Sequence, residues 1–585
     1  MNFCPQKDKP MRKSILNAIL LLGLASLPVG CAGCGEDVPG PDPEPASPPE
    51  PEADTYCQDQ GFTSHAFNTD TGGALFGDLA EDFTVNEYSG DTFTLSEAWT
   101  GCDSYIFFSY FSYMDANARN QMDTLWASDF AGILQSGTRN VHYFYISEEM
   151  DASAREGRMY MMQTNFDTAL QTLFGEDTDE IDFWTSRFHF VTDQLTAVEG
   201  GVGDFAIDYL VYRNNADPVD LGDRGQAYPP PPTSFAIDRN QRWDPVGSLS
   251  EYVGGPENLK MAAFNSAFYN HRAELKAHLA AQTDITVVEL VDEMVTARVF
   301  NKDVTLPDAD AMATMDTFEI DVEITCPHRN PFGCSEWDRI ARMSLCTEYD
   351  AADIDTCTAS TEIVRWITPY WRRGTRHWVM DASPFLALIK DGGVQRFRIE
   401  MGPAWERATE RHATMSVRLS NQDKGLISQS VLRAFGGGTF NADYNSTHVP
   451  FTFTPPSDAT RVEIVTIISG HGQTSGNNCA EWCNHMHFFT VNGSDTPHEV
   501  SYSDIGNDVG CAARADEGAM PGQWGNWPQS RAGWCPGLPV ETVRFDITGE
   551  ITLGSENTLT YEASFNGNTP AGGDISKNTY VVWYQ

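Results

Sequence analysis

The pattern of hydrophobic residues changes near Asp284, and this change limits most strongly what the chain can fold into. Before that point, strand-like runs at 104–111 and 141–146 alternate with helical stretches such as 255–282. Beyond it, short segments of alternating polar and apolar residues follow one another with turn residues between them. Because one core does not produce both patterns, we expect the 585 residues to form an α/β part followed by an all-β part.

Short sequence patterns indicate the order of elements in the α/β part. Examples are residues 82–85 and 232–240, which lie before and after the buried strand expected at 104–111. This order resembles the thioredoxin-like fold of the peroxiredoxin type. A redox-active member needs a cysteine just after the buried strand, where a helix N-terminus lowers the thiol pKa. Residues 110–117 contain no cysteine, so we expect a redox-silent scaffold or recognition domain. Cys57 and Cys102 are expected to form a structural disulfide.

The all-β part is long enough for two sandwiches. Strand patterns at 317–324, 396–400 and 461–468 are typical of jelly rolls, and the stretch 419–428 suits a join between two of them. We therefore expect a multidomain chain with an N-terminal α/β thioredoxin-like domain and two all-β jelly-roll domains. The expected divisions are a signal peptide at 1–30, a linker at 31–56, the α/β domain at 57–285, the first jelly roll at 286–419 and the second at 420–585.

The first residues have the features of an export signal. Basic residues from Lys7 to Lys13 precede the apolar run 15–27, which is too short to span a bilayer. The run ends before Gly30 and Cys31, a junction that resembles a bacterial lipobox, so Cys31 is a candidate for lipidation; the alternative is plain secretion. The Pro- and acid-rich linker is expected to be an extended spacer. We expect an exported protein, either an outer-membrane or cell-surface lipoprotein or a secreted one.

Charge and motif content exclude several classes of function. The chain has 38 Lys and Arg against 82 Asp and Glu, a net charge of −44, so nucleic acid is not expected as a partner. With 41% hydrophobic residues it is not a disordered acidic tail. It has no Gly-x-Ser-x-Gly elbow, no His-Glu-x-x-His motif and no phosphate-binding glycine loop. We expect a monomer whose only membrane contact is a lipid anchor at Cys31, where one is attached.

Eight cysteines in the all-β part occur in pairs that are close in sequence. The pairs are Cys326 with Cys334, Cys346 with Cys357, Cys479 with Cys483, and Cys511 with Cys535. In an exported chain such pairs indicate disulfides first. Another interpretation concerns the segment 479–487, where two cysteines are followed by His485 and His487, a combination that suits zinc or copper.

Two of these pairs place a carboxylate beside a tryptophan. Cys334 is followed by Ser335, Glu336, Trp337, Asp338 and Arg339, and the third pair encloses Glu481 and Trp482. An indole partly removes its neighbour from water, which raises a carboxyl pKa towards the range of a general acid or base. Two such carboxylates, one from each sandwich, could meet in a cleft between the domains.

Five strings carry a resemblance to a known family: residues 334–339, 367–371, 468–472, 479–483 and 531–537. Their residues, order and spacing resemble those of the peptide-N-glycosidase F amidases, which are enzymes of two jelly rolls, from about Val295 to the C-terminus. The resemblance implies the disulfides Cys326–Cys334, Cys479–Cys483 and Cys511–Cys535, and Cys346–Cys357 is a local addition across a hairpin.

The resemblance also implies a reaction: hydrolysis of the amide between the innermost GlcNAc of an N-linked glycan and an asparagine side chain, with no cofactor and no metal. The substrate would be an N-glycoprotein or glycopeptide. Asp338 matches the principal catalytic residue, expected as the general base, and Glu481 matches the second carboxylate. The positions expected to contact substrate are Arg339, Arg531, Trp337, Trp482, Trp534 and Trp405.

The sequence departs from the family at several positions of the cleft. The family's third carboxylate would fall on Pro403, two residues before Trp405, with Glu400 or Glu406 as substitutes out of register. His471 stands where the family has a tryptophan, and Ser335 where it has an aspartate. Two alternatives therefore stay open. One is a non-catalytic glycan-binding surface protein; the other is a copper-dependent monooxygenase-like protein that would use the pair His485 and His487.

Overall fold

A computed structural model provides the structure of the chain. It describes residues 55–585 except 115, 128, 217–218, 221–225, 228–232, 248–256, 327–333, 336, 407–408, 473–478, 503–504, 566, 569 and 571. The expected signal peptide, Cys31 and nearly all of the expected linker lie outside the described residues. Within the described part, no helix has the length and apolar character needed to cross a membrane.

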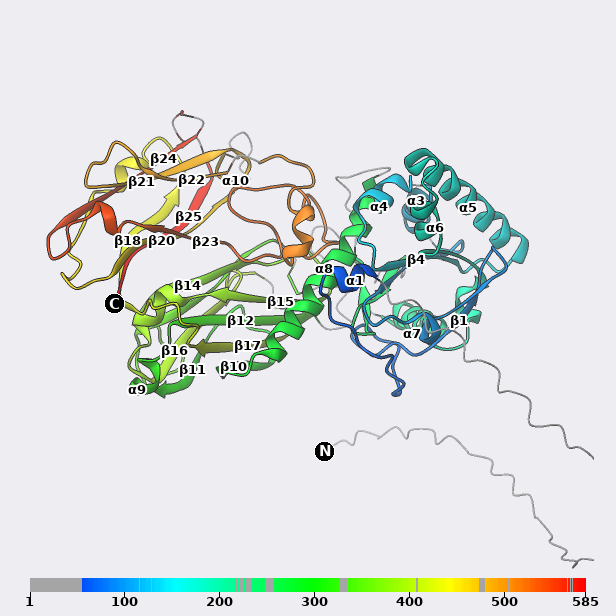
Figure 1. The fold of residues 1–585 in the computed structure, drawn as a ribbon, viewed down its shortest axis with the longest axis horizontal. Coiled ribbons are helices and arrows are strands. Elements are labelled where there is room, and N and C mark those ends of the chain that lie inside the picture. Colours follow the sequence, from blue (N-terminus) through cyan, green and yellow to red (C-terminus); the bar gives the residue numbers. More distant parts are fainter. Residues whose placement is uncertain are drawn as a thin grey trace, which may run out of the picture. The chain divides into compact units, whose positions relative to one another are not determined.

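The N-terminal part, residues 55–281, is built on one mixed sheet, and we call it the α/β module (Figure 1). Its strands lie in the order β5-β4-β3-β8-β9. The first three are parallel, whereas β8 and β9 are antiparallel to their neighbours. Their bounds are β3 Ser104–Tyr110, β4 Val141–Ser147, β5 Phe188–Gln194, β8 Ser234–Ile237 and β9 Trp243–Pro245.

The strands β3 and β4 are buried along their whole length, as expected for parallel strands with helices on both faces. Figure 1 shows α5 and α7 on opposite sides of this sheet. The helices are α1 Thr55–Asp59, α2 Leu95–Ala98, α3 Ala116–Trp126, α4 Ala131–Ser136, α5 Ala152–Phe174, α6 Thr178–Thr185, α7 Gly201–Asn215 and α8 Glu257–Ala281. Short pairs are formed by β1 Thr84–Asn86 with β2 Thr92–Thr94 and by β6 Val219–Asp220 with β7 Gln226–Ala227. The expected Cys57–Cys102 disulfide is present.

Eight antiparallel strands follow in two four-stranded sheets, and we call them the first sandwich. The sheets have the orders β10-β17-β12-β15 and β11-β16-β13-β14. In β12 the side chains of Phe318, Ile320, Val322 and Ile324 are buried in alternation, the pattern of a strand with one face on the core. The strands are β10 Ile285–Val295, β11 Val299–Asp308, β12 Thr317–Cys326, β13 Ile340–Glu348, β14 Ala359–Ile367, β15 Gly374–Asp381, β16 Gly392–Met401 and β17 Arg411–Ser420.

The last eight strands repeat this arrangement as a second sandwich. Its sheets are β18-β25-β20-β23 and β19-β24-β21-β22, so both sandwiches pair their first strand with the eighth, the eighth with the third and the third with the sixth. Eight antiparallel strands in two sheets are the jelly-roll arrangement. The strands are β18 Ser428–Thr439, β19 Phe451–Phe453, β20 Arg461–His471, β21 His485–Val491, β22 His498–Ser501, β23 Thr542–Asp546, β24 Asn557–Phe565 and β25 Asp574–Tyr584.

The disulfides of the sandwiches agree with expectation at three of four places. Cys326–Cys334, Cys346–Cys357 and Cys511–Cys535 are formed. The expected Cys479–Cys483 disulfide was wrong, because Cys483 is a free cysteine; the side chain of Cys479 lies outside the described residues. The chain winds into α10 (Cys479–Trp482) at this place. This helical turn ends at Trp482, directly before Cys483.

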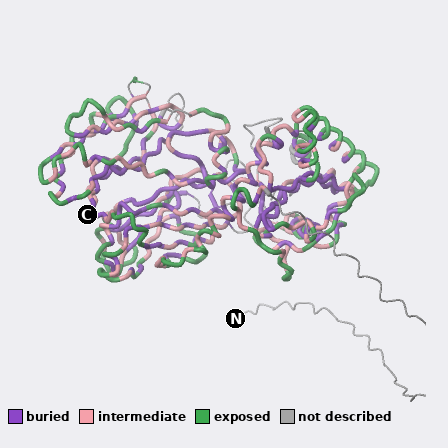
Figure 2. Tube along the Cα trace, viewed as in Figure 1, coloured by how far each residue is buried: buried purple, intermediate pink, exposed green. Residues whose placement is uncertain are grey.

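The two sandwiches are joined through a buried ion pair on β14. Arg365 donates to both carboxylate oxygens of Glu362 and also to the Ser469 hydroxyl and the Ser576 carbonyl of the second sandwich. Asn578 on β25 donates to the same carboxylate. Figure 2 shows that buried residues continue through both sandwiches. Burial raises the pKa of Glu362, but Arg365 outweighs it and holds this pKa below the usual value.

This pair provides a test of the fold. Arg365→Met should lower the free energy of unfolding by about 3–5 kcal/mol, because it leaves the Glu362 carboxylate buried without its cation. The double variant Arg365→Met with Glu362→Leu should recover most of that loss. Arg398→Met, which removes a partly exposed partner of Glu400, is the matched control and should cost less than about 1 kcal/mol. Urea unfolding measures all three, and equal losses for Arg365→Met and the control would contradict this account.

Candidate active site

Three connections at one end of the sandwiches bring the expected charged residues together. Asp338 precedes β13, Glu481 lies on α10 directly after β20, and Arg531 lies in the long connection between β22 and β23. The Arg531 guanidinium is 3.7 Å from Asp338 Oδ2 through Nη2 and 3.4 Å from Glu481 Oε1 through Nε. The two carboxylates therefore share one guanidinium.

Arg531 is buried and held on several sides. Its Nη1 donates to the Gln529 carbonyl at 2.9 Å and its Nη2 to Asn526 Oδ1 at 2.8 Å. The guanidinium lies over the rings of Trp482 and Trp534, 4.6 and 4.9 Å from their centroids. A cation between two indoles in a site poor in water interacts strongly with nearby anions, because little solvent screens it.

Asp338 is a carboxyl group tuned by opposing effects. The pKa of Asp338 is raised to about 7. Burial and the nearby Glu481 carboxylate raise this pKa, whereas Arg531 and Tyr370 lower it. The Oδ2 atom has no hydrogen-bond partner among the described residues. A carboxyl that titrates near neutrality and keeps a free acceptor atom is suited to take a proton from water.

Glu481 is fixed by backbone groups as well as by Arg531. The Gly472 N–H donates to its Oε2 at 3.0 Å, and its own carbonyl accepts from the Ala532 N–H. Gly472 has φ +115°, a conformation that side-chain-bearing residues avoid, so a glycine is needed to aim this N–H. Together these bonds tie α10 to the chain on both sides of the second carboxylate.

Tyr370 belongs to the site although the sequence analysis did not name it individually. Its hydroxyl lies near enough to Asp338 to lower the pKa of that carboxyl, and its backbone N–H donates to Gln523 Oε1 at 2.9 Å. The next residue, Trp371, has φ +40°, and its N–H donates to the Ser335 carbonyl. Strained backbone of this kind is found where surrounding structure enforces it. The available signal was the string 367–371, which contains Tyr370.

Arg339 pairs with Glu406, one of the two acids considered as substitutes for the third carboxylate. Its Nε donates to Glu406 Oε1 at 2.9 Å, and Glu406 Oε2 lies 3.4 Å from Arg298 Nη2. Glu400, the other substitute considered for the third carboxylate, instead pairs with Arg398. Of these two acids, only Glu406 pairs with Arg339, the residue that follows Asp338 in the sequence.

The tryptophans expected to contact substrate divide into exposed and buried ones. Trp405 is 76% exposed and Trp337 38%, and the Arg339 guanidinium lies 5.1 and 5.7 Å from their ring centroids. Trp534 is only 3% exposed, donates to the Gly470 carbonyl and stacks on His471. Trp534 is therefore buried beside Arg531 and His471, whereas Trp337 and Trp405 are exposed.

The proposed metal ligands are core residues. His485 Nδ1 and His487 Nε2 hydrogen-bond each other at 2.9 Å. The remaining ring nitrogens bond the Ala480 carbonyl and the Tyr561 hydroxyl. All four nitrogens therefore have partners, and both rings are fully buried. The interpretation of this pair as a copper or zinc site was wrong, because a metal would have to displace every one of these bonds.

Part of the chain is similar to known proteins. Residues 439–582 match the family model described as Peptide-N-glycosidase F, C terminal. The Peptide-N(4)-(N-acetyl-beta-D-glucosaminyl)asparagine amidase F of Elizabethkingia miricola is 26% identical over 274 residues, which is 45% of this chain and 71% of that protein. Part of the C-terminal half of the chain is thus similar to peptide-N-glycosidase F.

Solved structures of the peptide-N-glycosidase F family are also similar. Recombinant peptide:N-glycanase F matches with a TM-score of 0.40 and 22% identity, over 52% of this chain and 96% of that one. The structure described as PNGF-II matches with a TM-score of 0.38 and 13% identity, over 54% of this chain and 67% of that one.

The raised pKa of Asp338 predicts a pH-dependent cost in stability. Its ordinary value is 3.8 and its folded value about 7, so above pH 7 folding keeps an unfavourable buried charge, whereas below pH 4 the group is neutral in both states. Asp338→Asn should therefore stabilise the protein by up to about 4 kcal/mol at pH 8 and by almost nothing at pH 4. Urea unfolding across this range measures the difference, and a gain independent of pH would contradict the burial account.

Proposed function

We propose that this protein hydrolyses the amide between the innermost GlcNAc of an N-linked glycan and an asparagine side chain. The observation that carries the proposal is the placement of Asp338 and Glu481 against one buried guanidinium, that of Arg531. Similarity to peptide-N-glycosidase F, at modest identity, supports an amidase-type enzyme. An N-glycoprotein or glycopeptide is the proposed substrate, and aspartate and the released glycan are the proposed products.

The proposed reaction begins with water. Asp338 takes a proton from water while the water oxygen forms a bond to the amide carbon. The carbonyl oxygen then becomes negative. The charge of Arg531 stabilises that oxyanion, and Glu481 helps to hold the water and the first sugar. The proton on Asp338 then passes to the amide nitrogen as the C–N bond breaks. Aspartate and a glycosylamine leave, and the glycosylamine loses ammonia in water.

The exposed indoles beside the site suit a carbohydrate. Trp337 and Trp405 flank Arg339, whose guanidinium is held by Glu406. Aromatic faces pack against the apolar faces of sugar rings, while fixed guanidinium groups donate to hydroxyl oxygens. We assign this surface to the inner sugars of the glycan.

We further propose three domains in an exported chain. The division is supported by the short connections after α8 at Ala281 and after β17 at Ser420. The strand order β5-β4-β3-β8-β9 supports a thioredoxin-like α/β domain, and β3 is followed by Phe111 without a cysteine. Four disulfides among the described residues suit an oxidising compartment, so secretion or lipid anchoring is proposed.

The direct test is release of glycan from a denatured N-glycoprotein. The wild type should free intact glycan and convert the linked asparagine to aspartate, which mass spectrometry of the peptide detects. Asp338→Asn should lower kcat by about 10²–10⁴-fold because the base is lost. Glycan binding without cleavage by the wild type would instead favour a non-catalytic glycan-binding protein.

The pH profile tests the role of Asp338 more closely. Since a base must be ionised, kcat/KM should fall about tenfold per pH unit below pH 7, where the Asp338 carboxyl becomes protonated. Arg531→Gln should move this acid limb to higher pH, because the guanidinium lowers the pKa of Asp338. An acid limb near pH 4 in the wild type would exclude Asp338 as the titrating base.

A pair of matched variants tests the third acid. Glu406→Gln removes the carboxylate that holds Arg339 and should raise KM for glycopeptide more than it lowers kcat. Glu400→Gln is the control, since Glu400 pairs with Arg398 and should leave both constants close to the wild type. Michaelis–Menten measurements with one defined glycopeptide distinguish the two, and equal effects would argue against a role for Glu406.

A further inference from the structure

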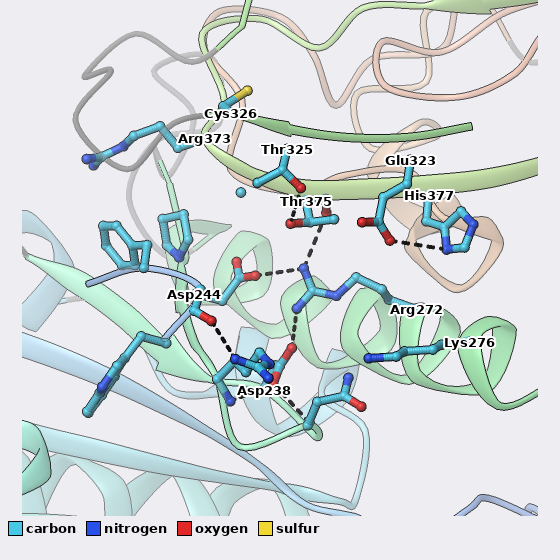
Figure 3. Close-up of a pocket in the computed structure, with 17 residues that line it drawn as sticks. Asp238, Asp244, Arg272, Lys276, Glu323, Thr325, Cys326, Arg373, Thr375 and His377 are labelled. Carbon is cyan, nitrogen blue, oxygen red and sulfur yellow. Dashed lines mark hydrogen bonds and ion pairs between the residues drawn. The ribbon is translucent and has the colours of Figure 1, made fainter. Parts of the chain in front are cut away.

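The α/β module is packed against both sandwiches through charged groups that are buried. On α8, Arg272 donates to Asp238 and Asp244 of the module and to the Thr375 carbonyl of β15 (Figure 3). A cavity of about 210 Å³ lies beside these groups, lined by both parts. On the same helix, His271 hydrogen-bonds the Asp516 carbonyl of η5 (Ala512–Glu517) in the second sandwich. The module is thus an integral part of the packed structure.

Arg372 joins three segments at this boundary. Its guanidinium is fully buried and donates to the Pro245 carbonyl of the module and to the Pro521 carbonyl of the connection that carries Arg531. It also donates to the carbonyl of its neighbour Arg373. Two residues before Arg372 in the chain is Tyr370, which lies near enough to Asp338 to lower the pKa of that carboxyl.

Two glycines show how closely the module approaches that connection. A Cβ added to Gly247 would lie 2.2 Å from the Gly522 carbonyl oxygen and 2.9 Å from Arg372 Nε. A Cβ added to Gly522 would lie 1.9 Å from the Val246 carbonyl oxygen. Backbone therefore meets backbone here, and any side chain would force the two segments apart.

The connection in turn holds Tyr370. Gln523, next to Gly522, is fully buried and accepts from the Tyr370 N–H. Its Nε2 donates to the Met520 and Pro536 carbonyls, so the amide is fixed from both ends. A continuous path of hydrogen bonds and tight contacts thus runs from Gly247 through Gly522 and Gln523 to Tyr370 and Asp338.

We propose that the α/β module positions the hydrolytic centre, with Arg372 and the contact between Gly247 and Gly522 as its positioning elements. The module, which has no cysteine in the segment directly after β3, would thus have a mechanical role in place of a redox role. Arg372 touches no reacting atom; it acts on Asp338 through Tyr370 and through the connection that carries Arg531. The kinetic test of this inference rests on the proposed amidase function, whereas the hydrogen-exchange test does not.

Variants on both sides of the contact test the proposal. Gly247→Ala places a methyl group of the module against the Gly522 carbonyl and forces the two segments apart. Arg372→Lys keeps the charge but loses the planar set of donors of the guanidinium. Gly90→Ala is the matched control, because Gly90 shares a positive φ with Gly247 but has open space around it. It should leave activity unchanged and controls for backbone strain alone.

The expected result is a fall in kcat of about 10²-fold for Gly247→Ala and Arg372→Lys with KM nearly constant, since small displacements of reacting groups have effects of that size. The acid limb of the pH profile should also move to higher pH. The groups that face Asp338 are Arg531, Glu481 and Tyr370, and loss of the interaction with Tyr370 raises the pKa of Asp338. A lower melting temperature with unchanged kcat and acid limb would overturn the proposal.

Hydrogen exchange separates this proposal from the proposed function. In both variants the amide of Tyr370, which donates to Gln523, should exchange faster than in the wild type and in Gly90→Ala. Faster exchange would support the positioning role even if the wild type released no glycan, a result that would count against the amidase alone. Unchanged exchange at Tyr370 would overturn the positioning role whether or not the wild type is active.

Discussion

Two carboxylates that are largely removed from water, Asp338 and Glu481, lie against the same buried guanidinium, that of Arg531. Without that cation, the pKa of Asp338 would be higher still, because both burial and the neighbouring Glu481 carboxylate raise it. With it, burial still raises the pKa of Asp338, but only to about 7. One arginine has to be held between two acids from separate sandwiches. Trp482 and Trp534 lie against its guanidinium for this purpose, and Asn526 accepts a hydrogen bond from it.

The sandwiches supply the rigidity that this arrangement needs. The three loops that carry the charges leave β-strands at fixed registers, and the Cys326–Cys334 and Cys511–Cys535 disulfides restrain two of them. The segment after Arg531 also bonds the end of β14, where the Ile367 N–H donates to the Leu538 carbonyl. Arg365 on that strand ties the first sandwich to β20 and β25 of the second. The proposed catalytic geometry is therefore a property of both sandwiches together, and in our proposal of the α/β module as well.

Much of the fold follows from sequence because hydrophobic patterns report burial directly. The fully buried β3 and the alternating β12 were both predicted, and each pattern matches what its faces contact. Asp338, Glu481 and Arg531 were singled out through strings that resemble a known family, and the structure places their charged groups together. The role of Tyr370 could not be predicted, since it depends on Gln523, 153 residues away. The Cys479–Cys483 pairing failed because close spacing in sequence does not reveal a helical turn.

The central claim is that Arg531 keeps a buried Asp338 ionisable near neutral pH. Carbon-13 NMR of protein labelled at aspartate carboxyl carbons measures this most directly, with Asp338→Asn identifying the resonance. The account predicts that Asp338 titrates near pH 7 in the wild type, and at higher pH once Arg531 is replaced by glutamine. A wild-type Asp338 that titrates near pH 4, or that does not respond to the loss of Arg531, would contradict it.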